Sequence, residues 1–165
     1  MKNTLRLMAV TALIIPAFIG RVAAQTLSAD DTTFVTKATV GNTFEIEESK
    51  LALQRATDPK LKQFAQKMID DHTDALNKLA QASGKSGGAA PAALDKPHQA
   101  MLTNLSTFNG ADFDKIYQAD QVASHAETVA LLYDYIQNGQ NSDLKSWAST
   151  TLPVVKDHRA AINAM

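Results

Sequence analysis

Apolar residues recur along most of the chain at the spacing of an α-helix, and no segment shows the sustained alternation of a half-buried strand. Four breakers divide this pattern, namely "TDP" at 57–59, "GKSGGAAPAALDKP" at 84–97, "NG" at 109–110 and "NGQN" at 138–141. The helices predicted between them span about residues 29–56, 59–83, 97–107, 111–137 and 142–163. The sequence therefore predicts an all-α fold.

The connections between the four long helices predict how they are arranged. Short turns join the first to the second and the third to the fourth, which is typical of two helical hairpins. The link over residues 84–110 could run the length of a helix, near 40 Å at about 1.5 Å per residue. It permits a crossover as well as an up-and-down bundle, and the sequence alone does not choose between them. Because a short turn would suffice for up-and-down neighbours, we predict a ferritin-like four-helix bundle whose crossover contains the short extra helix.

The N-terminal residues have the pattern of a secretory signal. Two cations precede an apolar run over residues 7–19, and small residues follow at the positions that a signal peptidase reads. The run is too short for a transmembrane helix, which needs about 20 residues. We predict a signal peptide over residues 1–24, cleavage before Gln25, a single domain over 25–165 and a periplasmic location.

Charge and cysteine content exclude several classes of partner. Without Lys2, Arg6 and Arg21, the chain keeps 13 Lys and Arg against 17 Asp and Glu, so the mature net charge is about −4. This balance argues against nucleic-acid binding and against anionic membrane surfaces. The chain has no cysteine, so we expect no lipid-anchored Cys and no disulfide. No later segment is a transmembrane candidate, whereas a protein partner and the oligomeric state stay open.

Each long helix carries one polar side chain on its inward face. His72, His125 and His158 each lie in a lane, meaning a line of apolar residues at helical spacing along one side of a helix. Glu45 lies in the lane of the first helix. Counting from the turns places all four near mid-length, so we expect them to converge at one level. Glu48 is a further inward candidate. The acidic row Asp120, Glu127 and Asp134 is expected on a solvated face, and Asp71 is expected to face a neighbouring helix or solvent.

Two kinds of chemistry fit this predicted cluster. A buried carboxylate must be paired, protonated or metal-bound, because leaving it unpaired costs several kcal/mol. A hydrogen-bonded Glu–His network that fixes helix register is favoured. The alternative is one divalent transition metal ion held by Glu45, His72, His125 and His158. No other cofactor is indicated.

Three motifs carry a resemblance to a known family. They are "KxFAxxMxxDH" ending at His72, "FDxxY" at 113–117 and "LPxxxxH" ending at His158. With these motifs the chain resembles the bacterial family called domain of unknown function 4142, whose members are exported, often labelled predicted outer membrane protein, and described as ferritin-like. The resemblance implies an inward glutamate at Glu45 and histidines at 72, 125 and 158. Ile69 and Val155 stand where a di-iron ferritin pattern needs Glu, so ferroxidase activity is not implied.

These observations favour a non-enzymatic envelope protein, related to envelope stress, whose cluster is structural or binds one metal. The first alternative is a metal-binding protein or metalloenzyme that uses the cluster. The second is a helical binding module for another envelope protein, which would need a broad exposed apolar patch. No thiol nucleophile, phosphate-binding loop or nucleophile elbow supports other enzyme chemistry.

Overall fold

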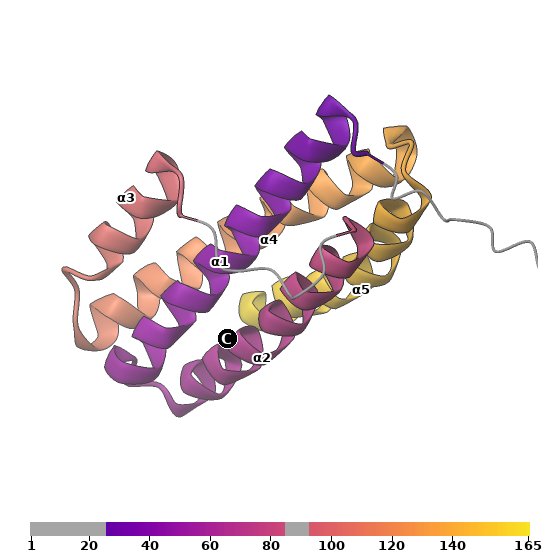
Figure 1. Ribbon diagram of the computed structural model, residues 1–165. Helices are drawn as coiled ribbons and strands as arrows, with labels where there is room; N and C mark the ends of the chain where they lie inside the picture. Colours follow the sequence, from indigo (N-terminus) through magenta and orange to yellow (C-terminus); the bar gives the residue numbers. More distant parts are fainter. Residues whose placement is uncertain (1–25, 85–92) are drawn as a thin grey trace, which may run out of the picture.

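A computed structural model describes residues 26–84 and 93–165, and within these residues it is all-helical, as predicted (Figure 1). No strand occurs in the described part of the chain. The helices are α1 (Ala29–Arg55), α2 (Pro59–Ala82), α3 (Lys96–Leu105), α4 (Gly110–Asn138) and α5 (Ser142–Asn163). The predicted signal peptide lies outside the described residues. In the described helices no stretch is long and apolar enough to cross a membrane.

Local sequence explains where three of the four long helices begin. Ser28 caps α1 through a capping box with Asp31, which satisfies amide groups that have no partner within the helix. Asp58 caps α2, and Pro59 takes the first helical position, where its missing N–H costs nothing. Asn141 caps α5 by accepting from two backbone amides.

The four long helices lie side by side as two antiparallel hairpins, α1–α2 and α4–α5 (Figure 1). Helix α1 also packs on α4 in the antiparallel sense. Phe34 near the start of α1 stacks on Tyr135 near the end of α4, with ring centroids 3.7 Å apart. Further along α1, Ser49 bonds the hydroxyl of Tyr117 at 3.0 Å. Helix α2 packs against α5 in the same way.

Helix α2 ends at the opposite end of the molecule from the start of α4 (Figure 1). Leu79 near the end of α2 packs with Phe34, whereas Phe113 at the start of α4 packs with residues from the start of α2. The chain therefore passes from one end to the other between residues 82 and 110. Helix α3 lies in this passage and packs against α1 and α4. The rest of the predicted crossover includes residues 85–92, which lie outside the described residues.

The interior has three levels along the bundle axis. The Phe34 cluster fills one end, and its buried members are Phe34, Val35, Ala38, Leu79, Leu132, Tyr135, Leu144, Trp147, Ala148 and Val155. The Phe64 cluster fills the other end, with Ala52, Ala56, Leu61, Phe64, Ala65, Met68, Leu105, Phe113, Tyr117 and Ile162. Between them lies a central polar layer, which comprises the buried residues Asn42, Glu45, Glu48, Ser49, His72, Gln121, Ser124, His125 and His158. Burial of polar groups at mid-length requires an explanation from their chemistry.

Candidate metal centre

Three histidines from three helices meet in the central polar layer, as predicted from their lanes. His72 of α2, His125 of α4 and His158 of α5 are all buried. Their ring centroids lie 5.7 Å apart for His72 and His125, and 5.5 Å apart for each of the other two pairs. One ring nitrogen from each lies within 4.8 Å of the other two. The imidazoles are therefore close enough to act on a common ligand.

The first imidazole is oriented by an asparagine on α1. His72 Nδ1 lies 2.9 Å from Asn42 Oδ1. The amide of Asn42 donates its N–H to the carbonyl of Ala38 at 2.7 Å, so its oxygen must be the atom that faces the histidine. An amide oxygen only accepts, so His72 donates from Nδ1 and keeps a lone pair on Nε2.

The second imidazole is oriented by the backbone of its own helix. His125 Nδ1 lies 2.8 Å from the carbonyl oxygen of Gln121, one turn earlier in α4. A carbonyl oxygen can only accept, so the proton of His125 is on Nδ1 and the lone pair is on Nε2. Glu45 Oε1 lies 3.3 Å from the same Nδ1 and adds a second acceptor.

The third imidazole is oriented by a carboxylate on α2. His158 Nε2 lies 2.7 Å from Asp71 Oδ2, and Lys67 pairs with the same carboxylate. Partial burial alone would raise the pKa of Asp71, but the hydrogen bonds from Lys67 and His158 hold it below its ordinary value. Asp71 is therefore ionised and accepts, which leaves the lone pair of His158 on Nδ1. As expected, Asp71 faces a neighbouring helix.

The remaining nitrogens of the three rings have no hydrogen-bond partner in the described structure. They are His72 Nε2, His125 Nε2 and His158 Nδ1, and each is shielded from solvent. All three carry lone pairs by the tautomers derived above. Three buried acceptors without a donor are unfavourable, because each has lost its hydrogen bonds to water. A cation placed between them would satisfy all three at once.

Two of the three imidazoles are held uncharged by their surroundings. Burial, followed by the influence of the other two histidines, holds the pKa of His72 well below its ordinary value. Burial also lowers the pKa of His158 to about 4, although the hydrogen bond to Asp71 opposes this shift. These two rings are therefore neutral at pH 7, the state in which imidazole binds metals.

Glu45 lies in the same layer but behind His125. Its carboxylate accepts hydrogen bonds from the amide of Gln121 at 2.5 Å and from the hydroxyl of Ser124. It approaches His125 on the Nδ1 side, away from the lone pair. Its oxygens are not in the group of atoms that lie within 4.8 Å of one another. The four expected residues therefore converge as three facing imidazoles with a carboxylate behind one of them.

Glu48 belongs to a second group of polar residues beside Glu45. The amide of Gln121 donates to Glu48 at 2.8 Å as well as to Glu45. Burial, followed by the neighbouring charge of Glu45, raises the pKa of Glu48 well above its ordinary value. Burial also raises the pKa of Asp120, which shares a hydrogen bond with Glu48. A hydrogen bond between two carboxyl groups requires a proton on one of them, and burial favours the neutral form of both.

The expectation that Asp120 lies on a solvated face is wrong. Its side chain is only partly exposed and hydrogen-bonds to buried Glu48, whereas Glu127 and Asp134 of the same row are exposed, as expected. The seven-residue spacing that put these residues in one row is too coarse to detect the difference in their exposure. A helix drifts about 20° in seven residues, so Asp120 lies closer to α1 than Asp134 does.

The raised pKa of Glu48 leads to a testable prediction for Glu48→Gln. A carboxyl whose pKa is raised by folding contributes most to stability below its unfolded value of 4.5, and this contribution is lost as the pH rises. Glutamine keeps the shape and the donor but cannot ionise. We therefore expect the difference in unfolding free energy, variant minus wild type, to increase from pH 4.5 to 8. The increase should be about 1.4 kcal/mol for each pKa unit of the shift.

Urea denaturation at several pH values measures this difference. Glu47→Gln is the matched control, because Glu47 is exposed on the same helix and pairs with Lys50. Its difference from the wild type should stay flat over the same range. A flat difference for Glu48→Gln as well would show that Glu48 is ionised in the folded protein.

Three residues that orient or surround the cluster were not identified from the sequence. They are Asn42, Gln121 and Asp120. A signal existed for two of them. Asn42 precedes Glu45 by one turn on α1, and Gln121 precedes His125 by one turn on α4, so both share the inward side. Polar residues one turn from a buried polar residue are candidates for its hydrogen-bond partners.

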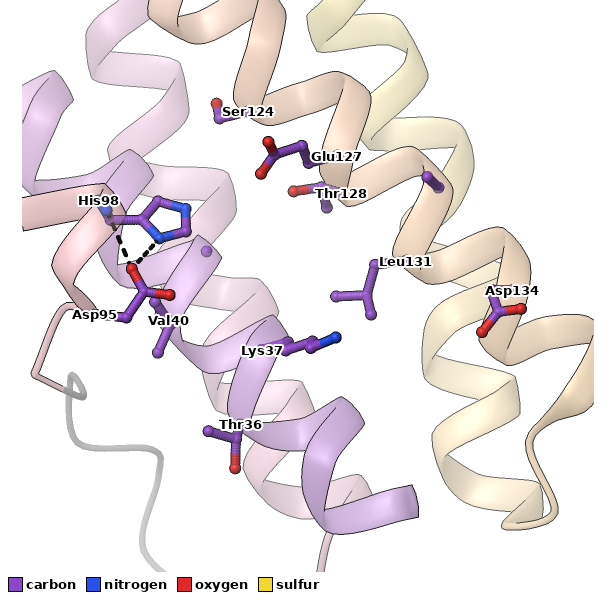
Figure 2. A pocket seen from close by; sticks show the side chains of 12 residues that line it. Thr36, Lys37, Val40, Asp95, His98, Ser124, Glu127, Thr128, Leu131 and Asp134 are labelled. Atoms are coloured by element: carbon purple, nitrogen blue, oxygen red, sulfur yellow. Dashed lines mark hydrogen bonds and ion pairs between the residues drawn. The ribbon is translucent and has the colours of Figure 1, made fainter. Parts of the chain in front are cut away.

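Two pockets approach the polar layer from opposite sides. The larger, of about 560 Å³, lies between α1 and α4 beside α3. Its lining reaches the polar layer at Ser124, whose hydroxyl donates a hydrogen bond to Glu45. Figure 2 shows Glu127 and Lys37 facing this pocket from its two walls, with His98 hydrogen-bonded to Asp95 at its edge. His98, the fourth histidine, lies outside the cluster.

The smaller pocket, of about 360 Å³, is a groove between α2 and α5. Its lining includes Asp71 and His158, so it reaches a member of the cluster and the carboxylate that orients it. The larger pocket has no histidine of the cluster in its lining. The three-histidine cluster is therefore reached by a surface pocket on its α2–α5 side.

Comparison with known proteins supports the resemblance seen in the motifs. No curated protein and no solved structure matched the chain. The family model described as Domain of unknown function (DUF4142) matches residues 19–165, which is nearly the whole chain. The protein is thus a member of the DUF4142 family.

Proposed function

We propose that this protein binds one divalent transition metal ion between His72, His125 and His158. The observation that carries the proposal is the set of three buried nitrogens with lone pairs and no partner. A metal-free network, which the sequence favoured, needs donors between the rings. The outer partners of the rings are all acceptors, so every ring proton points outward. This arrangement supports a metal ion over a network.

The ligand set indicates which ions fit. Three neutral imidazoles suit zinc, cobalt, nickel or copper, whereas calcium and magnesium prefer oxygen ligands. Zinc is commonly held by three protein ligands with a water or another small ligand in the fourth position. We therefore propose zinc or a similar ion. Histidine ligands usually donate their other N–H to an outer acceptor, which fixes the ring and raises its basicity.

Glu45 and Asp71 would contribute from outside the ligand shell. Each carboxylate accepts from a ring N–H of the cluster, Glu45 from His125 and Asp71 from His158. Their negative charges would offset part of the charge of a bound divalent ion. In this proposal Glu45 is a partner of His125, in place of the direct ligand role expected from the sequence.

We further propose that the fold is a ferritin-like four-helix bundle and that the protein is exported to the periplasm. The first is supported by the two antiparallel hairpins and by the passage of the chain between their ends. The second is supported by the signal-like pattern over residues 1–24. The alternative of a helical binding module has less support. The exposed large apolar side chains of the described residues are Tyr133, Val154 and Met165, which come from different parts of the chain.

One purification tests the metal and export proposals together. The full chain, without an affinity tag, is expressed and recovered from the periplasm, and its intact mass should lack residues 1–24. The protein is stripped with a chelator and titrated with Zn²⁺ and Co²⁺, and it should bind one ion per chain. Absence of stoichiometric binding by the folded protein would overturn the metal proposal. A full-length mass would overturn the export proposal.

A further inference from the structure

The three imidazoles differ in how far their outer partners lie from solvent. Asn42, which orients His72, is 5% exposed, and Gln121, which orients His125, is fully buried. Asp71, which orients His158, has a side chain that is 32% exposed. Of the three outer partners, Asp71 is therefore the one that reaches solvent, and it does so between α2 and α5.

The groove between α2 and α5 leads to this point. Asp71 and His158 are part of its lining, together with Thr151 and Val154 on the side of α5. The larger pocket between α1 and α4 ends at Ser124, whose hydroxyl donates to Glu45. That pocket also has the carboxylates Asp95, Glu127 and Asp134 in its lining, but in the described structure none of them is bonded to a histidine of the cluster. A cation in the groove would meet Asp71, a carboxylate that bonds His158 directly.

We propose that the groove between α2 and α5 is the path by which the metal ion enters and leaves the three-histidine site, with Asp71 as the residue that the ion meets first. This inference rests on the proposed function, because it concerns the ion that the histidines would hold. It adds a route for exchange, which three buried ligands need.

The charges at the mouth of the groove fit this role. Lys67 pairs with Asp71, and Lys78 pairs with Asp74, both at the surface of α2. Such exposed pairs contribute only about 0–1 kcal/mol, so an incoming divalent ion can displace the lysine. Asp157 is a third carboxylate in the lining, without a lysine partner among the described residues. The ion then passes to the imidazoles as Asp71 and His158 move apart.

A residue that lines the entry path and a residue that binds the ion affect the kinetics of metal binding in different ways. A residue that only narrows the path changes the association and dissociation rates by the same factor, because the ion crosses the same barrier in both directions. The dissociation constant, their ratio, is then unchanged. A residue that binds the ion changes the dissociation constant itself. This difference separates the path from the site.

The test is a stopped-flow measurement on the full-length mature chain. Co²⁺ is mixed with metal-free protein to measure association, and loaded protein is mixed with excess chelator to measure dissociation. In Val154→Trp, a bulky ring at a half-exposed position fills the groove. We expect both rates to fall by about tenfold, which corresponds to a barrier higher by about 1.4 kcal/mol, with the dissociation constant unchanged.

The matched control is Ala130→Trp, which places the same ring in the larger pocket on the other side of the molecule. It should leave both rates as in the wild type. Thr150→Trp, at an exposed position in the α2–α5 groove, repeats the test if Val154→Trp does not fold. Slower exchange in Ala130→Trp with normal exchange in the groove variants would overturn the path. Equal rates in all the variants would also overturn it.

The equilibrium titration keeps this test separate from the proposed function. If wild-type protein binds no Co²⁺, the metal site itself is refuted. If it binds one ion per chain and the groove variants exchange normally, only the path is refuted. A third variant tests whether the charge of Asp71 attracts the incoming ion. Asp71→Asn should slow association and weaken its dependence on salt, because a charge that attracts the ion is gone.

Discussion

Replacing His72 with leucine is expected to abolish the rise in melting temperature that a divalent metal gives to the wild type. At a free metal concentration of 100 times the dissociation constant, binding to the folded state alone adds about 2.7 kcal/mol. For a domain of about 140 residues this corresponds to a rise of roughly 10 °C. The variant loses one of three ligands and should show no rise at the same concentration.

The stability of the metal-free variant separates this effect from simple damage to the fold. Leucine fills the position with an apolar group and removes one of three facing lone pairs. Asn42 Oδ1 then loses its partner, at a cost of about 1–3 kcal/mol. Replacing a buried polar group by an apolar one is often neutral or stabilising, so these terms oppose each other. We expect the metal-free melting temperature to stay close to that of the wild type.

His98→Leu is the matched control for this substitution. His98 is a histidine outside the cluster, on α3, where its ring packs against Phe44 with centroids 4.8 Å apart. This variant should keep the full metal-dependent rise, as scanning calorimetry with and without Zn²⁺ can show. An equal loss in both variants, or a full rise in His72→Leu, would contradict the three-histidine site.

Phe64→Ala is expected to give the largest loss of stability, about 3–5 kcal/mol of unfolding free energy. Phe64 is buried where the Phe64 cluster meets the polar layer. Its ring centroid lies 6.5 Å from that of Tyr117, 6.4 Å from that of His125 and 6.5 Å from that of His158. Removing the ring leaves a cavity beneath two imidazoles, and the helices around it cannot close without moving both.

Urea denaturation of the metal-free protein measures this loss, with Phe108→Ala as control. Phe108 lies at the edge of the same cluster and is only partly buried, so its removal leaves a space that water can enter. Its loss should be less than half of that for Phe64→Ala. Similar losses for the two variants would show that the packing under the imidazoles has no special role in stability.

Helix positions and inward residues could be predicted from the sequence because they depend on periodicity. The caps at Ser28 and Asp58 are local signals, and both mark the observed helix starts. The lanes of His72, His125 and His158 required only that each helix bury its apolar side. Counting from the turns then placed the three rings at one level, because the hairpins are antiparallel.

The roles of the residues around the rings could not be predicted in the same way. Whether Glu45 faces the lone pair or the N–H of His125 depends on side-chain rotamers and on the spacing between α1 and α4. The same is true of Glu48, which hydrogen-bonds to Asp120, a residue that the pattern placed in solvent. Asp71 lies about 100° from His72 on α2, and only the neighbouring α5 gives it a histidine to orient. These relations are set by tertiary packing.

X-ray absorption spectroscopy of the zinc-loaded, tag-free protein tests the central claim most directly, because it reports the atoms bound to the ion. We predict three imidazole nitrogens at about 2.0–2.1 Å, with one water or other small ligand in the fourth position. The signal of the three rings should fall to two in His72→Leu loaded at high zinc concentration, and should stay at three in Glu45→Gln. A shell with fewer than three imidazoles in the wild type, or one made mainly of carboxylate oxygens, would contradict a three-histidine metal centre.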